Sequence, residues 1–384
     1  MNRLNVLFVD TTENYGYCFC ASNTKVEFMA RGLVEQGASV TIINSVVGNK
    51  YVSERIVIHK KDVGDVVSYP KKGNQLVSWL KNWKSLEKDI ASLKQNDAKN
   101  VVILEVADFH IYILYCYLAR KYGYKVVVIS HEWLPTVTTV HPLRRPSYAL
   151  YTKMFWKYVD GILPISEYII DKIKPFGKPY IKVPVLSEFN GKFTEKNDCR
   201  YFMYCVSGGY FRVIKTVLDA FENFHVMDTK GFKLILVLSG TEKSIRDVED
   251  YIEDNELNSI VEIYHQLPYD ELCRLYKNAS ALLIPLNPNS EQDHARFSQK
   301  IAEYVSSSAP IISCSVGEVP LYFKDKESAI LCDYNKLGFE NAFRWIAEHE
   351  DEARQIGLNG YDIGDKYFNY KVVGGELYHF LDKI

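Results

Sequence analysis

The sequence predicts an α/β protein built from two doubly wound, Rossmann-like domains that face each other across a cleft. Three observations lead to this fold class. Short runs rich in β-branched residues alternate with segments of helical periodicity along the chain, as in parallel sheets that are covered by helices on both faces. The alternation breaks once, near residue 190, and then restarts. The length of 384 residues also suits two hydrophobic cores better than one.

The first half of the chain opens with a predicted strand over 5–10 and a predicted helix over 23–37. The helix has one apolar face and ends at Gly37. That face consists of Val26, Met29, Ala30, Leu33 and Val34. Further strands are predicted over 39–44, 101–106, 125–130 and 161–166. Because ligands of doubly wound sheets bind beyond the carboxyl ends of the strands, the cleft between the two domains is the expected site.

A polar segment without periodicity, over 185–200, predicts the boundary between the domains. After it, strands are predicted over 201–207, 232–240, 260–267, 281–286 and 310–315. The resulting division has an N-terminal domain over 1–186, a linker over 187–199, a C-terminal domain over 200–362 and a C-terminal helix over 363–384.

The composition is that of an ordinary soluble protein and argues against several functions. A formal net charge of −2 gives no general attraction to nucleic acid. The eight cysteines form no C-x-x-C pair, which favours reduced thiols in a cytosolic protein over disulfides or a zinc site. The longest apolar stretch, over 111–119, is far shorter than the ~20 residues of a membrane-spanning helix, and the apolar run near residue 5 is too short for a signal peptide. No G-x-G-x-x-G follows a predicted strand and no P-loop motif is present, which disfavours both of those nucleotide-binding classes.

The second half carries an ordered series of short motifs. A glycine pair at 208–209 follows a predicted strand, and Lys215 comes six residues after the pair. The stretch "LPYDELCRLY" begins a helix, Lys300 precedes Glu303 by three residues on a later helix, and "GEVP" follows at 317–320. This series resembles the donor-binding half of the retaining glycosyltransferases of family 4, which have the GT-B fold. The resemblance is specific over about 200–335 and extends weakly to "SHEW" and "GILPISEY" in the first half.

The resemblance implies a retaining glycosyltransferase that moves a sugar from a nucleotide-diphosphate sugar to a glycan or lipid-linked acceptor. The implied setting is the biosynthesis of surface polysaccharide or glycoconjugates, and the nucleotide sugar is a substrate, so no cofactor is expected. The resemblance also implies that the helix over 363–384 crosses back to the first domain. We expect no metal, since the sequence has no Asp-x-Asp and no His/Cys cluster with ligand spacing.

The chemistry of such a transfer requires positive charge near the departing diphosphate. Lys215 and Lys300 are the candidate cations, with a solvated surface lysine as the alternative for Lys215. Ser298 is a candidate N-cap, and the N–H groups of the helix start at Gln299 are candidates for holding a phosphate oxygen. The resemblance assigns the ribose hydroxyls to Glu303. The alternative for Lys300 and Glu303 is an i, i+3 ion pair worth ~0.2–0.5 kcal/mol.

Other donor-binding residues follow from the resemblance alone. It places His265 and Leu267 against the base, largely through their backbone, and Phe297 beside Ser298 and Gln299 in the donor site. Gly208 and Gly209 would let the backbone approach the phosphates, and an ordinary tight turn is the alternative. Gly16, in the loop after the first strand, would bring that loop near the donor.

The sequence departs from the family pattern at several positions. Glu105 stands where many relatives have a histidine that touches the sugar. His131 follows another strand at its carboxyl end, where a site residue is expected, and a structural histidine is the alternative. Tyr210 stands where the family usually has an arginine, and Arg212 is the candidate substitute. Ala295 replaces an acid of the family motif. These departures keep a second interpretation open, a catalytically silent subunit that binds a nucleotide sugar; a GT-B epimerase or phosphorylase is less favoured.

Two segments predict contact with an anionic membrane. The segment 74–94 forms an amphipathic helix with lysines opposite an apolar face, and 141–159 combines arginines with aromatic residues. The apolar face of the first segment consists of Leu76, Trp79, Leu80, Trp83, Leu86, Ile90 and Leu93. The alternative is that the first segment packs on the N-terminal sheet. We expect a cytoplasmic protein that also reaches the inner face of the membrane.

Overall fold

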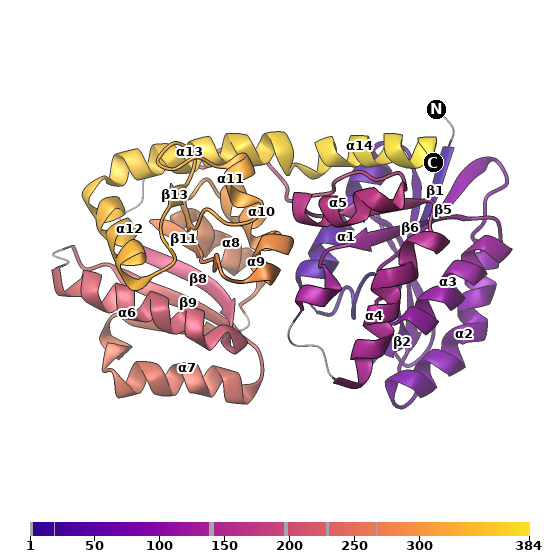
Figure 1. Cartoon of the computed structure of the whole chain (residues 1–384), viewed down its shortest axis with the longest axis horizontal. Helices are drawn as coiled ribbons and strands as arrows, with labels where there is room; N and C mark the ends of the chain where they lie inside the picture. The colour runs from indigo at the N-terminus through magenta and orange to yellow at the C-terminus, as the bar shows by residue number, and fades with distance from the viewer. Residues whose placement is uncertain (1–2, 19, 138–141, 196–198, 228–229, 266) are drawn as a thin grey trace. The chain divides into compact units, whose positions relative to one another are not determined.

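The computed structural model describes residues 3–18, 20–137, 142–195, 199–227, 230–265 and 267–384 (Figure 1). The chain divides into two compact units. The first unit comprises residues 1–187, 295–299 and 367–384, and the second comprises 188–294 and 300–366. The described residues of the predicted linker after Ser187 form no helix or strand, and residues 196–198 lie outside the described residues.

The first unit contains a seven-stranded sheet in the order β3-β4-β2-β1-β5-β6-β7. Its strands are β1 (Arg3–Val9), β2 (Ser39–Asn49), β3 (Ile56–Lys60), β4 (Gly64–Pro70), β5 (Ala98–Leu104), β6 (Lys125–Ser130) and β7 (Gly161–Pro164). All neighbours pair in parallel except β3, which is antiparallel to β4. The parallel sheet is confirmed, but β3 and β4 were not predicted. Three residues, 61–63, separate these two strands, which is too short for a crossover connection and leaves only a hairpin.

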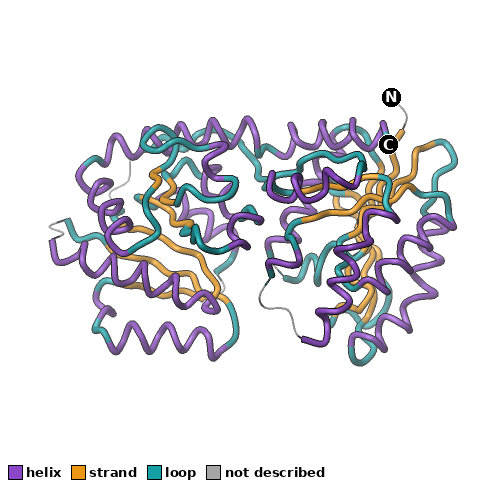
Figure 2. Tube along the Cα trace, in the orientation of Figure 1, coloured by secondary structure: helices purple, strands orange, loops and turns teal. Residues whose placement is uncertain are grey.

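Helices cover both faces of this sheet (Figures 1 and 2). They are α1 (Ala21–Glu35), α2 (Gln75–Ser92), α3 (Phe109–Lys121), α4 (Arg145–Met154), α5 (Glu167–Ile173) and α14 (Tyr370–Lys383). Alternate residues of β1, namely Leu4, Val6 and Phe8, pack in one core with α1 and α14. Figure 1 shows α2 and α3 on the other side of the sheet. The doubly wound arrangement that the alternation predicted is therefore present in the first unit.

Helices α1 and α14 approach each other through two glycines. A Cβ atom added at Gly32 would lie 2.8 Å from the Cα atom of Gly374, and one added at Gly374 would lie 2.4 Å from the Cα atom of Gly32. Such distances are closer than packed side chains allow, so the two backbones touch only because neither residue has a side chain. This contact fixes the position of α1, whose first turns lie at the carboxyl ends of the strands.

The apolar stripe that was predicted to form one face of α2 is divided in the structure. Trp79, Leu86 and Ile90 are buried, whereas Leu76 and Leu80 are 62% and 57% exposed. The predicted face is therefore only partly buried. Its buried residues pack on the sheet, as the packing alternative expected, and two polar residues share this contact. Asn82 donates hydrogen bonds to the carbonyl oxygens of Val46 and Pro70. The buried carboxylate of Asp89 accepts two hydrogen bonds from Arg55, at 2.9 and 2.7 Å.

The second unit contains a six-stranded sheet in the order β10-β9-β8-β11-β12-β13, in which all neighbouring strands are parallel. Its strands are β8 (Tyr201–Ser207), β9 (Lys233–Ser239), β10 (Val261–His265), β11 (Ala281–Ile284), β12 (Ile311–Ser313) and β13 (Ile330–Leu331). The predicted second doubly wound domain is confirmed, with each strand within a few residues of its expected place. Only the two-residue strand β13 was not predicted.

The helices of the second unit are mostly short and amphipathic. They are α6 (Phe211–Met227), α7 (Glu242–Asp254), α8 (Tyr269–Asn278), α9 (Glu291–Ala295), α10 (Gln299–Ser306), α11 (Val319–Tyr322), α12 (Lys336–Glu348) and α13 (Glu350–Tyr367). A cluster of phenylalanines joins β8 to α6 and α12. The ring of Phe202 lies 4.6 Å from that of Phe343 and 5.8 Å from that of Phe224, centroid to centroid. Because this cluster anchors β8, the turn that follows Ser207 has a fixed position.

Candidate functional site

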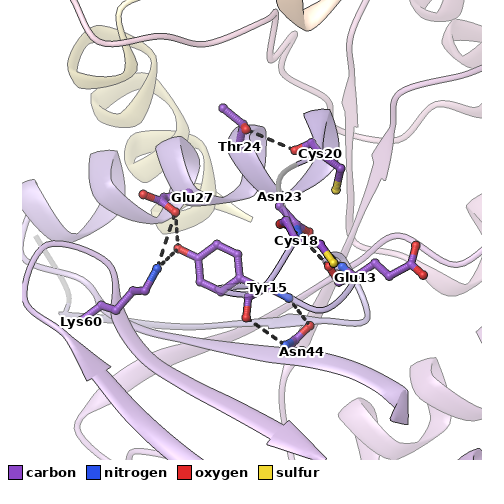
Figure 3. Close-up of polar contacts among 9 residues, drawn as sticks. All are labelled: Glu13, Tyr15, Cys18, Cys20, Asn23, Thr24, Glu27, Asn44 and Lys60. Carbon is purple, nitrogen blue, oxygen red and sulfur yellow. Dashed lines mark hydrogen bonds and ion pairs between the residues drawn. The ribbon is translucent and has the colours of Figure 1, made fainter. Parts of the chain in front are cut away.

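The loop between β1 and α1 is held in place by two asparagine side chains (Figure 3). Asn23 donates to the carbonyl oxygens of Glu13 and Cys18 at 2.7 and 3.0 Å, and accepts from the N–H of Glu13 at 2.9 Å. Asn44 accepts from the N–H of Tyr15 at 3.1 Å. The amide side chains of Asn23 and Asn44 therefore fix the loop.

The side chain of Tyr15 also anchors this loop, and the chain turns at Gly16. The Tyr15 hydroxyl is hydrogen-bonded to Glu27 and accepts from Lys60 at 3.2 Å (Figure 3). Gly16 has φ +86°, a conformation that favours glycine. It is exposed and does not belong to the described lining of the two cavities described next. The predicted donor contact of Gly16 stays a prediction, and the turn explains the glycine without it.

A cavity of about 670 Å³ opens at the carboxyl ends of β5 and β6 in the first unit. Residues from the start of α1, from α4 and from the segment 296–299 line it. Its polar lining includes Ser22, Lys25, Glu105, Ser130, His131, Glu132, Arg144, Tyr148, Tyr151, Arg296, Ser298 and Gln299. The position agrees with the expectation that ligands bind beyond the strand ends. Glu105, His131, Phe297, Ser298 and Gln299, all predicted from the sequence, line this one cavity.

Glu105 and His131 meet at the floor of the cavity. Each follows a strand, β5 or β6, and the Nδ1 atom of His131 lies 2.8 Å from the Oε1 atom of Glu105. The other oxygen, Oε2, and the other ring nitrogen, Nε2, are both buried and have no hydrogen-bond partner among the described residues. Burial lowers the pKa of His131, although the charge of Glu105 opposes this shift. The pair therefore contains two unpaired polar atoms that lie just beneath the surface of the cavity.

Lys25 is the main functional candidate that the sequence reasoning missed. It lies on α1, is 3% exposed, and donates one hydrogen bond, at 2.9 Å, to the carbonyl oxygen of Val183. Burial lowers its pKa to about 7, and the charge of Glu105 partly opposes this shift. A signal for this residue was present, because Lys25 lies four residues before Met29 and seven before Gly32, on the face of the helix that is otherwise apolar.

The segment 295–299 joins the first unit through backbone and side-chain contacts. Ser166 donates to the carbonyl oxygen of Ala295 at 2.6 Å. The Gln299 side chain is hydrogen-bonded through both its amide nitrogen and its oxygen to the backbone of Leu186. Phe297 packs edge-on against Phe368, with 5.5 Å between ring centroids. The amide of Gln299 and the ring of Phe297 therefore act as anchors, which leaves the backbone N–H of Gln299 for a ligand.

A second cavity, of about 530 Å³, adjoins the first unit's strands β1 and β2 and shares Glu105, Arg144 and Tyr148 with the first cavity. Asp10 lies in its wall with φ +53°. Its carboxylate accepts from the Tyr115 hydroxyl and from the N–H of Val46, each at 2.5 Å. Burial raises the pKa of Asp10. This cavity is polar enough to take a hydroxylated ligand next to the one held in the first.

In the second unit, the glycine pair follows β8 as a short 3₁₀ helix (Gly208–Tyr210). A Cβ atom at Gly208 would lie 2.4 Å from the carbonyl oxygen of Ser244. Close packing against α7 is therefore sufficient to explain this glycine, and this explanation differs from the tight turn that was the alternative to phosphate binding. Gly209 is exposed, and a Cβ atom there would meet only the Ser207 hydroxyl, at 3.6 Å. The turn is open at Gly209.

Lys215 is engaged in a surface network. It is the fifth residue of α6, one turn inside the helix rather than in its first turn. Its Nζ atom donates to the Tyr251 hydroxyl at 2.6 Å and lies 3.3 Å from Asp219. These contacts raise its pKa. These two contacts leave one N–H of the Lys215 ammonium for another acceptor.

Glu303 is buried on α10, with 5% of its surface exposed. Among the described residues, no hydrogen bond reaches its carboxylate, and no ion pair within 4.0 Å joins it to Lys300. Burial raises its pKa to about 7, and the positive charge of Lys300 opposes this shift. The ion pair that was the alternative for these two residues is therefore absent. The carboxylate of Glu303 is held in the protein without an internal partner.

The remaining predicted residues of the second unit lie at its surface. His265 ends β10, and its Nε2 atom lies 3.2 Å from Glu249. Leu267 follows it and is half-buried, whereas Arg212 is exposed near the start of α6. No contact in the described residues tests their proposed roles. Ala295, at the position of the missing acid, is buried.

Residues 194–363 match the family model described as "Glycosyl transferases group 1". This match covers most of the second unit and less than half of the chain. A search of curated proteins finds no match.

Solved structures resemble the whole chain. Sucrose-phosphate synthase from Thermosynechococcus elongatus has 12% identity and a TM-score of 0.73, with 99% of each chain covered. HepE from Anabaena in complex with UDP has 10% identity and a TM-score of 0.71, with 100% of each chain covered. The pneumococcal O-GlcNAc transferase GtfA in complex with UDP and GlcNAc has 11% identity and a TM-score of 0.66, with 100% of this chain and 99% of that one covered. The chain therefore has the GT-B fold of glycosyltransferases, and its C-terminal region matches their group 1 model.

Proposed function

We propose that the protein is a glycosyltransferase that takes its sugar from a nucleotide-diphosphate donor. The observation that carries this proposal is the carboxylate of Glu303, which is buried without an internal partner in the unit that matches group 1 glycosyl transferases. Leaving a carboxylate unpaired in a protein interior is unfavourable and is typical of groups that meet a ligand. Two ribose hydroxyls would supply the missing hydrogen-bond donors.

The leaving diphosphate needs positive charge, and we assign this task first to Lys300. It lies three residues before Glu303 on α10 and has no ion-pair partner within 4.0 Å among the described residues. The N–H groups at the start of α10 add the positive end of a helix. Arg212 is exposed near Gly209 and is a second candidate. Lys215 stays a candidate that has one N–H left for a phosphate oxygen beside its contacts with Tyr251 and Asp219.

We further propose that the sugar occupies the 670 Å³ cavity, with its hydroxyls on Glu105 and His131. The acceptor, a glycan or a lipid-linked sugar, would occupy the adjoining 530 Å³ cavity, so that both substrates meet at the shared residue Glu105. Retention of the anomeric configuration, transfer without a metal, and a role in surface polysaccharide or glycoconjugate synthesis belong to this proposal through the family resemblance.

A nucleotide-sugar-binding subunit without catalytic activity is the second candidate. Lys215 is held by two partners, and Tyr210 stands in place of the family arginine, which favours this candidate. Both candidates require nucleotide binding, and only the first requires that the sugar–phosphate bond is cleaved.

We expect one nucleotide among UDP, GDP, ADP and CMP to raise the melting temperature, because a ligand that binds only the folded state stabilises it. The sugar conjugates of that nucleotide should then be hydrolysed slowly, and equally well with and without EDTA. Thermal shift followed by product analysis measures both. Stabilisation without hydrolysis would support the silent subunit. Stabilisation by none of the four would refute both candidates, and activity that EDTA abolishes and Mg²⁺ restores would refute metal independence.

We also propose that the first unit rests on anionic membrane at the cytoplasmic face. Among the described helices, none combines the length and the apolarity that crossing a bilayer requires. Leu76 and Leu80 are exposed beside Lys81 and Lys84 on α2, and Leu143 is exposed beside Arg144. His141, the first residue of the second predicted segment, lies outside the described residues.

Replacing Leu76 and Leu80 together with serine should reduce co-sedimentation with phosphatidylglycerol vesicles at low salt severalfold, because binding depends on the apolar area that enters the interface. Leu337→Ser is the matched control, since Leu337 is similarly exposed on α12 of the second unit. Equal binding of all three proteins, or no binding by the unmodified chain, would argue against the membrane contact.

A further inference from the structure

The inference concerns Lys25, Glu105 and His131, which line the 670 Å³ cavity together. A lysine ammonium has three N–H donors. Lys25 uses one of them on the carbonyl oxygen of Val183, and the other two have no partner among the described residues. A buried cation without full pairing is unfavourable. Its position therefore calls for an explanation beyond packing.

The contact between Glu105 and His131 determines which atoms remain free. A carboxylate can only accept, so the 2.8 Å contact places the proton of a neutral imidazole on Nδ1. The Nε2 atom is then an acceptor with a lone pair, and Glu105 Oε2 is a second acceptor. Both atoms are buried and lack a partner among the described residues. Protonation of His131 would convert one of these acceptors into a donor.

Lys25 influences the protonation state of His131 through its charge. Its positive charge disfavours a second positive charge on His131, in addition to the effect of burial. Its pKa is lowered to about 7, so it is still largely charged over the range in which a histidine with a lowered pKa titrates. Other charged and titratable groups face the same cavity: Glu132, Arg144, Tyr148, Tyr151 and Arg296. Of these, Arg144 is paired with Asp108 at 2.6 Å, and Glu132 favours the protonated imidazole.

We propose that Lys25 is a positioning residue that opposes a positive charge on His131 and holds Nε2 as an acceptor, so that Nε2 and Glu105 Oε2 can bind two hydroxyl groups of a sugar when the side chains turn these buried atoms toward the cavity. The identity of the ligand as a sugar rests on the proposed function, whereas the protonation state of His131 does not. These acceptors favour a neutral polyol, because a phosphate or carboxylate at this place would meet the negative charge of Glu105. The free N–H groups of Lys25 can donate to the oxygens of the same hydroxyls.

Histidine NMR on the full-length protein tests the protonation state without any ligand. Spectra of ¹⁵N-histidine protein between pH 5 and 8 report the protonated nitrogen and the pKa, and His131→Gln identifies the signal. In the unmodified protein the proton should lie on Nδ1 and the pKa of His131 should be below its ordinary value. Lys25→Met should raise that pKa, and Lys25→Arg should keep it low. Lys99→Met is the matched control, because Lys99 also donates to a carbonyl oxygen, that of Asp382, but lies at the opposite end of β5.

Two results would overturn the proposal: a proton on Nε2 in the unmodified protein, or the same pKa of His131 in Lys25→Met. If Lys25→Met does not fold, Glu105→Gln replaces it. That variant removes the carboxylate that favours the charged imidazole, so it should lower the pKa of His131 further, and an unchanged or raised value would contradict the arrangement.

A kinetic measurement tests whether Lys25 contributes to sugar binding. It uses the nucleotide sugar that the protein hydrolyses in the product analysis that follows the thermal-shift measurement. Lys25→Met should lower kcat/KM roughly tenfold or more, the loss expected for one hydrogen bond involving a charged group. The acid limb of its pH profile should move to higher pH, because His131 then takes up a proton more readily, and Lys25→Arg should restore most of the rate. If the NMR result is as predicted but no nucleotide sugar is hydrolysed, the proposed enzymatic activity is refuted, whereas the effect of Lys25 on the protonation of His131 is not. Hydrolysis that Lys25→Met leaves unchanged would refute the role of Lys25 in sugar binding.

Discussion

Replacing Glu303 with glutamine is expected to stabilise the protein at pH 8 and, at the same time, to weaken its binding of the nucleotide. The two effects have one cause, a carboxylate that is buried without a partner among the described residues. Glutamine has nearly the same shape and no charge, so the penalty for burying the charge disappears. The charged acceptor for the ribose hydroxyls disappears as well, and hydrogen bonds to charged groups contribute about 1.5–3 kcal/mol.

The sign of the stability effect follows from the shifted pKa of Glu303. Burial raises this pKa from 4.5 to about 7, so the folded state holds its proton more tightly than the unfolded state. The contribution of Glu303 to stability is therefore most favourable below pH 4.5 and is lost as the pH rises through 7. Since one pKa unit corresponds to about 1.4 kcal/mol, the loss at pH 8 is about 3 kcal/mol at most. Glutamine removes this pH dependence and recovers part of that energy.

Urea unfolding at pH 5 and pH 8 measures the stability effect, and isothermal titration with the nucleotide from the thermal-shift panel measures affinity. Glu253→Gln is a matched control, because Glu253 lies exposed on α7 of the same unit and should change neither quantity. A Glu303→Gln variant with unchanged affinity would remove the basis for assigning the ribose to this residue. Loss of stability at pH 8 would mean that the carboxylate has a partner.

The sequence was sufficient to predict the fold wherever the local pattern and the tertiary structure agree. The strands of both parallel sheets are buried and rich in β-branched residues, so their positions were predicted to within a few residues. Strand β3 was missed although it contains three β-branched residues, because an antiparallel edge strand in a hairpin does not follow the alternation of strands and helices. The burial of Asn82 and Asp89 on α2 was missed for a different reason. It depends on Val46, Pro70 and Arg55, residues that only the folded chain brings to the helix.

The residues of the candidate site also divide into those that a local sequence pattern predicts and those that depend on the tertiary structure. His131 was predicted because it follows a strand at its carboxyl end, and Glu105 was predicted from the family resemblance. The structure brings the two side chains into contact, since residues that follow neighbouring parallel strands meet at one edge of a sheet. Lys25 was missed because a lysine in an amphipathic helix is normally solvated, and only its alignment with Met29 and Gly32 indicated otherwise. The network that holds Lys215 depends on Tyr251, which is 36 residues away in sequence. No local pattern contains that information.

Alanine at Gly374 and alanine at Gly375 are expected to change stability in opposite directions, although the two residues are neighbours on α14. A Cβ atom at Gly374 would lie 2.4 Å from the Cα atom of Gly32, so α14 and α1 must separate. Overpacking of this kind destabilises by about 1–3 kcal/mol, and more where backbone must move. A Cβ atom at Gly375 meets nothing nearer than the Gln36 side chain, at 3.8 Å. Within a helix, replacing such a glycine with alanine stabilises by up to about 1 kcal/mol.

Thermal and urea unfolding of the two variants measures this difference, and the variants also test whether the site depends on the packing of α1. Helix α1 carries Lys25 and, two turns later, contacts α14 through Gly32. Separating the two helices should therefore move the lysine away from Val183 and from the cavity. We therefore expect Gly374→Ala to lower the rate of donor hydrolysis even at temperatures where it remains folded, while Gly375→Ala keeps the full rate. Equal stabilisation by both alanines would mean that the backbones of α1 and α14 do not touch. A destabilised Gly374→Ala variant with full activity would show instead that the site tolerates movement of α1, and that the glycine contact supports the fold alone.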